Sequence, residues 1–355
     1  MIKVLVVEDS AVVRELLVHL FSLKPELHVV GTAGNGEEAL EAVKRWRPDV
    51  ITMDINMPRM NGFEATRRIM EACPTPIVIV SGSWDPEEVA TSFRAVEAGA
   101  LAVMARPTGI GHPDHEVTAA NLIQTVKLMA EVKVVRRWGR SRQEVAAPVP
   151  LASNQTKIEQ IQAEVQAVAI GASTGGPLVL QTILSRLPKV FPAPIFIVQH
   201  MAAGFMQGFV EWLAQSSSLP VRLAAQGEVI QPGQVYVAPD GVQMKVVPGG
   251  RIGLTQDAPE NGLRPSVSYL FRSVGETYGK RAAGVLLTGM GRDGAQELKM
   301  MRDKGAITLA QDEGSSVVHG MPGVAIQLGG AAYVLPPDRI ATALASLVNH
   351  NSATR

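Results

Sequence analysis

The sequence predicts two α/β domains, each built on a largely parallel sheet, with a linker between them. The chain has 355 residues, which is enough for two domains of ordinary size. Two stretches alternate short apolar runs of strand length with longer segments of helical spacing. Between them, residues 136–160 are first basic, then rich in proline and alanine, and then polar, with no sustained period. Such a segment is typical of an interdomain linker.

The first stretch contains five strand–helix units. Strands are expected at 2–7, 29–31, 50–53, 76–80 and 101–104, and helices at 12–23, 36–46, 62–73, 86–98 and 119–135. Five consecutive units of this kind predict a parallel sheet with helices on both faces. Chemically active groups should then lie at the carboxyl ends of the strands.

The second stretch repeats the α/β pattern. Longer strands are expected at 165–170, 194–198, 283–287 and 306–310, with short ones near Val221, Val235, Val242 and Ile252. Helices are expected at 177–187, 205–215, 267–278, 295–304, 322–328 and 338–348. This order predicts a doubly wound α/β domain with a mainly parallel sheet.

Composition excludes several classes of protein. Lys and Arg number 33 and Asp and Glu number 33, so the net charge of zero argues against a chain built mainly to bind nucleic acid. Cys73 is the single cysteine, which excludes an internal disulfide and a cysteine-rich zinc site. The apolar runs are shorter than the ~18 residues of a membrane span. The first residues turn acidic at Glu8 and Asp9, unlike a signal peptide. We expect a cytoplasmic protein with no membrane insertion.

Polar side chains follow three of the expected strands in the first domain. Glu8 and Asp9 follow the first strand, Asp54 the third and Ser81 the fourth. Strand ends of a parallel sheet converge, and clustered carboxylates favour a hard divalent cation such as Mg²⁺. An aspartate beside such an ion and a small hydroxyl is suited to accept a phosphoryl group. The alternative is that these acids only cap helices.

In the second domain a glycine-rich turn places Ser173 between a strand and a helix. A turn of this kind binds phosphate, or presents a nucleophile with backbone N–H groups nearby. A dinucleotide site would have an acid at the next strand end, but that strand ends in Gln199-His200. No P-loop lysine follows Gly176. The nucleophile is therefore favoured.

His200 and Asp293 are the candidates to complete a catalytic triad. His200 follows Ser173 by 27 residues, the length of one strand–helix unit. Asp293 lies between Gly291 and Gly294 after another strand, where glycines let a carboxylate approach closely. Asp312, at the end of the next strand, is the weaker rival. Asp240 is interpreted as a turn residue.

The motifs of the first domain resemble those of response-regulator receiver domains. They are V-L-V-V-E-D-S-A, M-D-I-N-M-P-R-M-N-G and V-I-V-S-G-S, and the resemblance covers residues 1–125. It implies a flavodoxin-like fold with a five-stranded parallel sheet, in which Asp54 is the phosphoacceptor. Glu8, Asp9 and Asp54 would hold Mg²⁺ together with the backbone carbonyl of Asn56. Ser81 would bond the phosphoryl oxygen and move on phosphorylation.

Two positions depart from the receiver pattern. Arg106 stands where receivers have a lysine that contacts the phosphate, and Val103 stands where they often have an aromatic switch residue. An arginine can still bind phosphate, but its length and its forked geometry differ. We expect a weaker or slower phosphorylation switch on an ordinary receiver fold.

The motifs of the second domain resemble the catalytic domain of chemotaxis protein-glutamate methylesterases. They are I-G-A-S-T-G-G, V-Q-H-M, R-P-S-V, L-T-G-M-G-R-D-G and G-M-P, over residues 163–349, with 126–162 left as a helix extension and linker. The resemblance implies hydrolysis of glutamate γ-methyl esters on chemoreceptors, with release of methanol, and deamidation of receptor glutamines. Ser173 would be the nucleophile, His200 the base and Asp293 its orienter. The Met290 N–H, with Thr174 beside the nucleophile as a second contributor, would stabilise the oxyanion.

The same resemblance implies the partners and the regulation. Methyl-accepting chemoreceptors would be the substrate and a chemotaxis histidine kinase the phosphodonor, with no cofactor for the esterase and a monomeric chain. The receiver would block the esterase cleft until it is phosphorylated. The alternatives are a non-catalytic module that binds receptors or a kinase and, last, a DNA-binding regulator. We interpret 112–116, with its two histidines, as a loop and not a metal site, and the arginine run 136–142 as a solvated linker face.

Overall fold

The computed structural model describes residues 1–82, 86–132, 134 and 164–349. The chain divides into two compact units, 1–146 and 147–355. The expected linker, 136–160, and its arginine run lie outside the described residues. The finer domain boundaries, 1–125, 126–162 and 163–349, therefore stay predictions.

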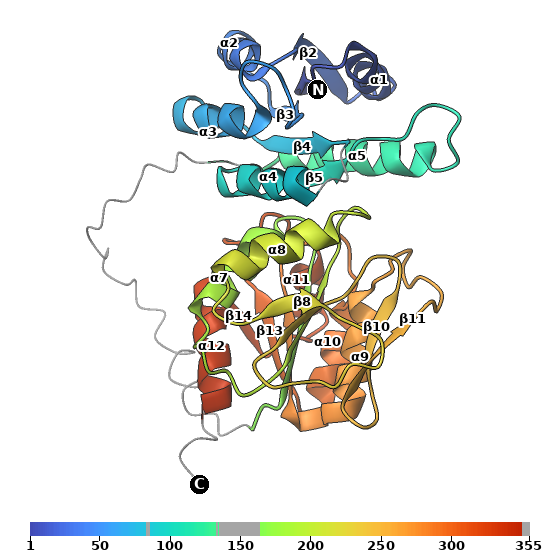
Figure 1. The fold of residues 1–355 in the computed structure, drawn as a ribbon, viewed down its shortest axis with the longest axis vertical. Coiled ribbons are helices and arrows are strands. Elements are labelled where there is room, and N and C mark those ends of the chain that lie inside the picture. The colour runs from blue at the N-terminus through green and yellow to red at the C-terminus, as the bar shows by residue number, and fades with distance from the viewer. Residues whose placement is uncertain (83–85, 133, 135–163, 350–355) are drawn as a thin grey trace, which may run out of the picture. The chain divides into compact units, whose positions relative to one another are not determined.

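The N-terminal unit is built on a five-stranded sheet (Figure 1). Its strands are β1 (Ile2–Val7), β2 (Leu27–Ala33), β3 (Val50–Met53), β4 (Ile77–Ser81) and β5 (Ala102–Ala105). Their order is β2-β1-β3-β4-β5, and all neighbours are parallel. This is the flavodoxin-like order, whose topological switch point lies between β1 and β3.

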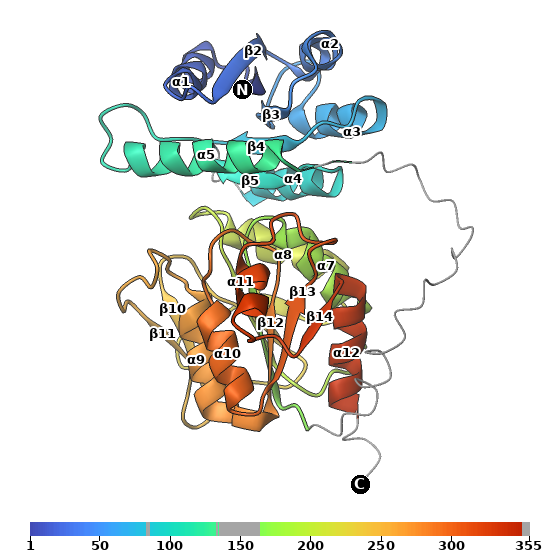
Figure 2. The ribbon, with the colours of Figure 1, turned by 180° about the vertical axis from the view of Figure 1, so that it is seen from behind.

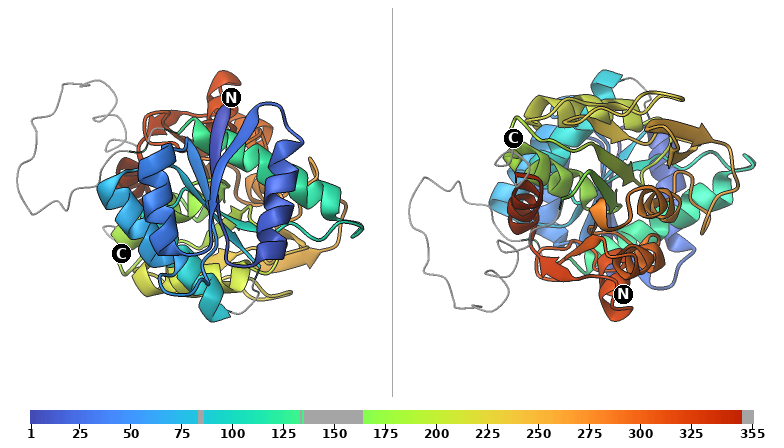
Figure 3. Two further views of the ribbon diagram at one scale, coloured as in Figure 1. Left: turned by 90° about the horizontal axis from the view of Figure 1, so that it is seen from above. Right: turned by 90° about the horizontal axis from the view of Figure 1, so that it is seen from below.

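Helices cover both faces of this sheet, as Figure 3 shows in the view from above. They are α1 (Ala11–Ser22), α2 (Gly36–Trp46), α3 (Gly62–Ala72), α4 (Pro86–Glu97) and α5 (His115–Ala130). Helix α1 contacts α5 on one face, while α2, α3 and α4 pack in a row on the other. Asn35 and Asn61 cap α2 and α3 by accepting backbone N–H groups of the first turn, which fixes where these helices begin.

The C-terminal unit has a seven-stranded sheet in the order β14-β13-β12-β6-β7-β9-β8. The strands are β6 (Ala167–Ala172), β7 (Ile195–Gln199), β8 (Val221–Leu223), β9 (Val235–Val237), β12 (Ala282–Leu286), β13 (Ile307–Gln311) and β14 (Tyr333–Leu335). All neighbouring strands are parallel. A separate antiparallel hairpin, β10 (Gln243–Val247) and β11 (Arg251–Thr255), packs on helix α9.

The helices of this unit form two layers (Figure 2). One contains α7 (Gly176–Arg186), α8 (Met206–Ser216) and α12 (Pro337–Asn349), and the other contains α9 (Val267–Tyr278), α10 (Ala295–Asp303) and α11 (Met321–Gln327). Strand β6 lies at the centre of the sheet and is buried along its whole length. The chain winds outward from β6 to β7 on one side and returns to β12 on the other, so the switch point adjoins β6.

The predicted fold class is confirmed in both units, and most element bounds agree within one or two residues. The last helix of the N-terminal unit was misplaced: it begins at His115 instead of 119 and ends at Ala130. The segment 112–116, expected as a loop, therefore contributes its last two residues to a helix. Val132 and Val134 disfavour the extension to 135 that spacing suggested. The short edge strand β14 was not expected at all.

Candidate functional site

Ser173 and His200 follow two neighbouring strands of the larger sheet. Strands β6 and β7 pair with Ala172 opposite Gln199, so the next residues of both strands, Ser173 and His200, leave the sheet side by side. The His200 backbone N–H donates to the Ala172 carbonyl at 2.9 Å. The Ser173 side chain is half-buried. The nucleophile candidate and the base candidate thus meet at the carboxyl edge of the sheet.

Asp293 reaches the same place from the loop after β12. Its Oδ2 lies 2.9 Å from His200 Nε2. The carboxylate is buried, with 2% of the residue exposed. The structure therefore brings Asp293 to His200, as the sequence suggested.

The N-terminus of α9 holds Asp293 in its charged form. Ser266 Oγ donates to Asp293 Oδ1 at 2.8 Å, and the N–H groups of Val267 and Ser268 donate to Oδ2 and Oδ1 at 2.6 and 3.1 Å. Burial alone would raise the pKa of Asp293, but the close contact with His200 and the hydrogen bonds from Ser268 and Val267 outweigh it and lower the pKa to about 2. The positive end of the helix dipole acts in the same direction.

The loop 287–292 lies against Ser173, the candidate nucleophile. The Ser173 N–H donates to the Thr288 carbonyl at 3.0 Å. Gly289 packs so closely that a Cβ there would lie 2.6 Å from Ser173 Cβ, so only glycine fits. Among the described residues, the backbone N–H of Met290 donates to no protein acceptor. This leaves an N–H group free one residue beyond the close contact with Ser173.

A surface cleft of about 350 Å³ opens beside Asp293. Its lining residues are Asn261, Leu263, Met290, Gly291, Arg292 and Asp293. The Met290 side chain is 44% exposed there.

The rival residues have other partners. Asp312 accepts hydrogen bonds from the N–H and the hydroxyl of Ser315 and so closes a local turn. Asp240 accepts from the Gly204 N–H at 2.8 Å just before α8, consistent with its interpretation as a turn residue. Thr174 contributes its carbonyl to the Thr288 hydroxyl at 2.9 Å, and its oxyanion role stays a prediction.

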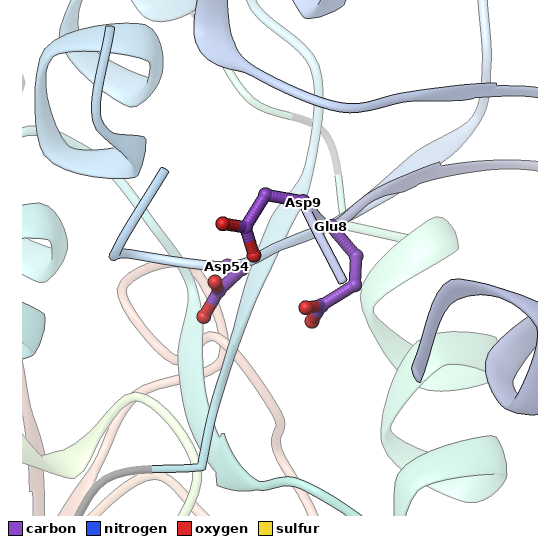
Figure 4. Close-up of side chains that lie close together, drawn as sticks. All are labelled: Glu8, Asp9 and Asp54. Atoms are coloured by element: carbon purple, nitrogen blue, oxygen red, sulfur yellow. The ribbon is translucent and has the colours of Figure 1, made fainter. Parts of the chain in front are cut away.

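In the N-terminal unit Glu8, Asp9 and Asp54 gather at the switch point between β1 and β3 (Figure 4). One carboxylate oxygen of each lies within 4.8 Å of the others. Glu8 and Asp54 are buried, and Asp9 is exposed. Backbone groups of Ile55 and Asn56 donate to Asp54, so Asn56 lies at the site. Three converging oxygen donors of this kind fit Mg²⁺.

Two of these carboxyl groups are poorly stabilised as anions. Burial raises the pKa of Glu8 to about 7, and the nearby Asp54 adds to the effect. Burial also raises the pKa of Asp54 to about 6, although the Arg106 charge opposes the increase. The pKa values rise because the clustered carboxylates have a single cation beside them. A bound divalent ion would lower these pKa values.

Arg106 lies inside this cluster. Its Nη2 is 3.0 Å from Glu8 Oε2 and 3.4 Å from Asp54 Oδ1. Its backbone N–H donates to the Ser81 carbonyl at 2.8 Å, which places both expected phosphate contacts at neighbouring strand ends. The guanidinium therefore lies beside two of the three carboxylates that are expected to bind Mg²⁺.

Several site residues were not identified from the sequence. Ser266 and Ser268 hold Asp293, and the motif R-P-S-V contains Ser266 but ends before Ser268. A serine before an apolar helical run is nevertheless a recognisable start signal. Gln199 was noted only as the neighbour of His200. Arg14 donates to the Glu8 carbonyl at 2.6 Å, and no sequence pattern pointed to it.

Comparisons with known proteins agree with this geometry. A family model described as CheB methylesterase matches residues 168–344, and a response regulator receiver domain model matches 4–112. A protein-glutamate methylesterase/protein-glutamine glutaminase of Nitrosospira multiformis is 59% identical over 355 residues, which cover 100% of this chain and 99% of the relative. The chain belongs to this family. A relative of the same description from Syntrophus aciditrophicus is 58% identical over 98% of both chains.

The C-terminal unit also resembles a solved structure of the family. The Thermotoga maritima CheB methylesterase catalytic domain has 38% sequence identity and a TM-score of 0.51, and the match covers 52% of this chain and 99% of that domain. The predicted family and enzyme class are thus confirmed, and the non-catalytic alternative is not favoured. No helix in the described part of the chain is long and apolar enough to cross a membrane.

Proposed function

We propose that the chain demethylates chemoreceptors by serine catalysis and deamidates receptor glutamines with the same groups. The observation that carries the proposal is the His200–Asp293 pair at the strand end next to Ser173. Proteins related to this chain over its whole length bear the name of this activity. The chemoreceptors supply the ester, and the chain acts as a cytoplasmic monomer.

The reaction begins at Ser173. Its Oγ attacks the γ-carbonyl carbon of the glutamate methyl ester while its proton passes to His200. Since Nε2 of His200 faces Asp293, Nδ1 is the ring nitrogen available for that proton. The Met290 N–H, with Thr174 as a second contributor, donates to the oxyanion that forms. Asp293 stabilises the imidazolium through its own negative charge.

Collapse of the tetrahedral intermediate breaks the bond to the methoxy oxygen. That oxygen takes the proton from His200 and leaves as methanol, while the acyl group stays on Ser173. Water, deprotonated by His200, then attacks the acyl carbon and releases the glutamate carboxylate and free Ser173. With a receptor glutamine the same sequence releases ammonia in place of methanol.

The N-terminal unit controls this activity by phosphorylation. The Asp54 carboxylate accepts a phosphoryl group from a chemotaxis histidine kinase. Glu8, Asp9, Asp54 and the carbonyl of Asn56 would hold Mg²⁺, which neutralises charge on the phosphoryl oxygens when it is bound. Ser81 and Arg106 would contact those oxygens from the neighbouring strand ends. The closeness of Arg106 to Asp54 favours the ionised carboxylate that the reaction needs.

The test measures methanol released from a methylated chemoreceptor cytoplasmic fragment. Ser173→Ala should fold normally, because a half-buried strand-end serine contributes little core volume. It should lose about 10⁴-fold or more in rate, as nucleophile removal does in other triads. Ser185→Ala, an exposed serine of α7, is the matched control and should keep full activity. Turnover by Ser173→Ala close to that of the wild type would refute the mechanism.

A further inference from the structure

Gln199, the last residue of β7, connects the backbones of the nucleophile and the base. Its Nε2 donates to the Ser173 carbonyl at 2.9 Å and to the His200 carbonyl at 2.8 Å. The side chain is buried, with 2% of the residue exposed. One amide group thus spans the gap between the two loops that carry the reacting side chains.

The surroundings fix this amide in one orientation. Turned over, it would place its oxygen against two carbonyl oxygens, which is electrostatically unfavourable. Its Oε1 is buried without a hydrogen-bond partner. Gly176 at the start of α7 leaves room for that oxygen, since a Cβ there would lie 2.2 Å from it. The site therefore retains an unsatisfied buried acceptor, which is a cost that a purely structural strand end would avoid.

The two carbonyls depend on Gln199 to different extents. The Ser173 carbonyl also accepts from the Gly176 N–H at 2.8 Å, so it keeps one partner without the amide. Among the described residues, the His200 carbonyl has no donor other than Gln199. Loss of the amide should therefore release the His200 backbone more than the Ser173 backbone.

We propose that Gln199 is a positioning residue that holds His200 in register with Ser173 for proton transfer. This inference rests on the proposed function, because it assigns Gln199 to the same reaction. A misplacement of about 1 Å between reacting groups can cost about 100-fold in rate. The expected signature is a lower kcat with little change in KM, since Gln199 is buried beneath the site and does not line the cleft.

The experiment compares Gln199→Met with Gln234→Met in the full-length chain. Gln234 makes the same two-carbonyl bridge, to Pro220 at 2.8 Å and Val235 at 3.1 Å, but at the amino end of β9. Gln199→Met should lower kcat for methanol release about 10- to 100-fold, and Gln234→Met should leave kcat unchanged. Thermal melting of both variants reports their folding. If the two variants had equal kcat values, the proposal would be overturned.

Two further measurements separate this proposal from the proposed function. A phosphonofluoridate reacts with Ser173 in the absence of receptor, so the rate of labelling reports the reactivity of the nucleophile. This rate should be lower in Gln199→Met than in the wild type. Gln199→Glu can donate a hydrogen bond only when its carboxyl is protonated, so its activity relative to wild type should rise as the pH falls. An unchanged labelling rate in Gln199→Met would contradict the role of Gln199. So would a ratio of Gln199→Glu to wild-type activity that does not change with pH. An inactive wild type would instead refute the proposed function.

Discussion

Asp54 and Asp293 occupy equivalent places in the two units but have opposite electrostatic surroundings. Each follows a strand that borders the switch point of a parallel sheet. Asp293 accepts three hydrogen bonds from the start of α9 and lies in close contact with His200. Its pKa is lowered to about 2. Asp54 is buried beside Glu8 and Asp9, and its pKa is raised to about 6.

The difference corresponds to the two chemical roles that we propose for these residues. A carboxylate that only has to hold an imidazolium benefits from a permanent charge that no assay pH removes. A carboxylate that has to become a phosphoryl acceptor needs open coordination positions, and these leave its anion under-stabilised until a cation binds. Position on the sheet gives both residues access to a ligand, and the local donors decide what each can do.

The largest effect should come from neutralising Asp293. Asp293→Asn keeps the size of the side chain but removes the charge that orients His200, so kcat should fall about 10³- to 10⁴-fold with a small change in KM. Asp312→Asn, which affects only the turn at Ser315, is the control. Steady-state methanol release measures both. A larger loss in Asp312→Asn would mean that the third triad member has been wrongly assigned.

The pH profile sharpens the same contrast. The pKa of Asp293, about 2, lies below its ordinary value, so the group stays ionised until the pH falls through that range. Asp293 therefore adds no protonation step of its own to the acid limb of the kcat/KM profile above pH 4. The logarithm of kcat/KM should rise with a slope of about one on the acid limb, or roughly tenfold per pH unit. A slope of two would show that Asp293 also titrates there.

Phosphorylation of Asp54 should have a smaller effect on rate. The gating that we expect, in which the N-terminal unit inhibits the esterase until Asp54 is phosphorylated, can be tested by removing that unit. We expect a truncated chain that starts near Ala163 to demethylate receptor about tenfold faster than the unphosphorylated full-length protein. A small phosphodonor with Mg²⁺ should raise the rate of the full-length protein to that of the truncated chain. Asp54→Ala in the full-length protein should prevent this increase.

The measurement is the rate of receptor demethylation by the full-length and the truncated protein, each with and without phosphodonor. These four rates show whether the N-terminal unit controls the esterase. A catalytic domain alone has been crystallised for a relative, so the truncation is a reasonable protein to prepare. Four equal rates would leave the N-terminal unit only a docking role.

The smallest effect is expected at Arg106. Its guanidinium lies against both Glu8 and Asp54, so it should compete with Mg²⁺ for these carboxylates. Arg106→Met should strengthen Mg²⁺ binding to the full-length chain about 3- to 10-fold in a calorimetric titration. The same variant should slow phosphorylation, since the phosphoryl group loses a cationic contact.

Arg68→Met, which removes an exposed arginine paired with Glu64 on α3, serves as the control and should bind Mg²⁺ as the wild type does. Weaker Mg²⁺ binding by Arg106→Met would show that Arg106 supports the metal site and does not compete with it.

The sequence by itself determined the architecture and indicated the main candidate residues for the two sites. Apolar runs of strand length, each followed by helical spacing, define parallel sheets, and parallel sheets collect their strand-end residues at one edge. Ser173, His200 and Asp54 could be found because each directly follows such a run. The flanking glycines favoured Asp293 over Asp312. The sequence could not show which of the two carboxylates lies close to His200.

Only the tertiary structure decided how these residues are held. The helix start at Ser266 reaches Asp293 across 27 residues of sequence, and Gln199 reaches Ser173 across 26. Arg106 reaches Glu8 across 98. Local sequence patterns report backbone preference and burial, which depend on near neighbours along the chain. Hydrogen bonds and charges act between groups that meet only after the strands have paired, and these interactions set the pKa values and orientations on which the chemistry depends.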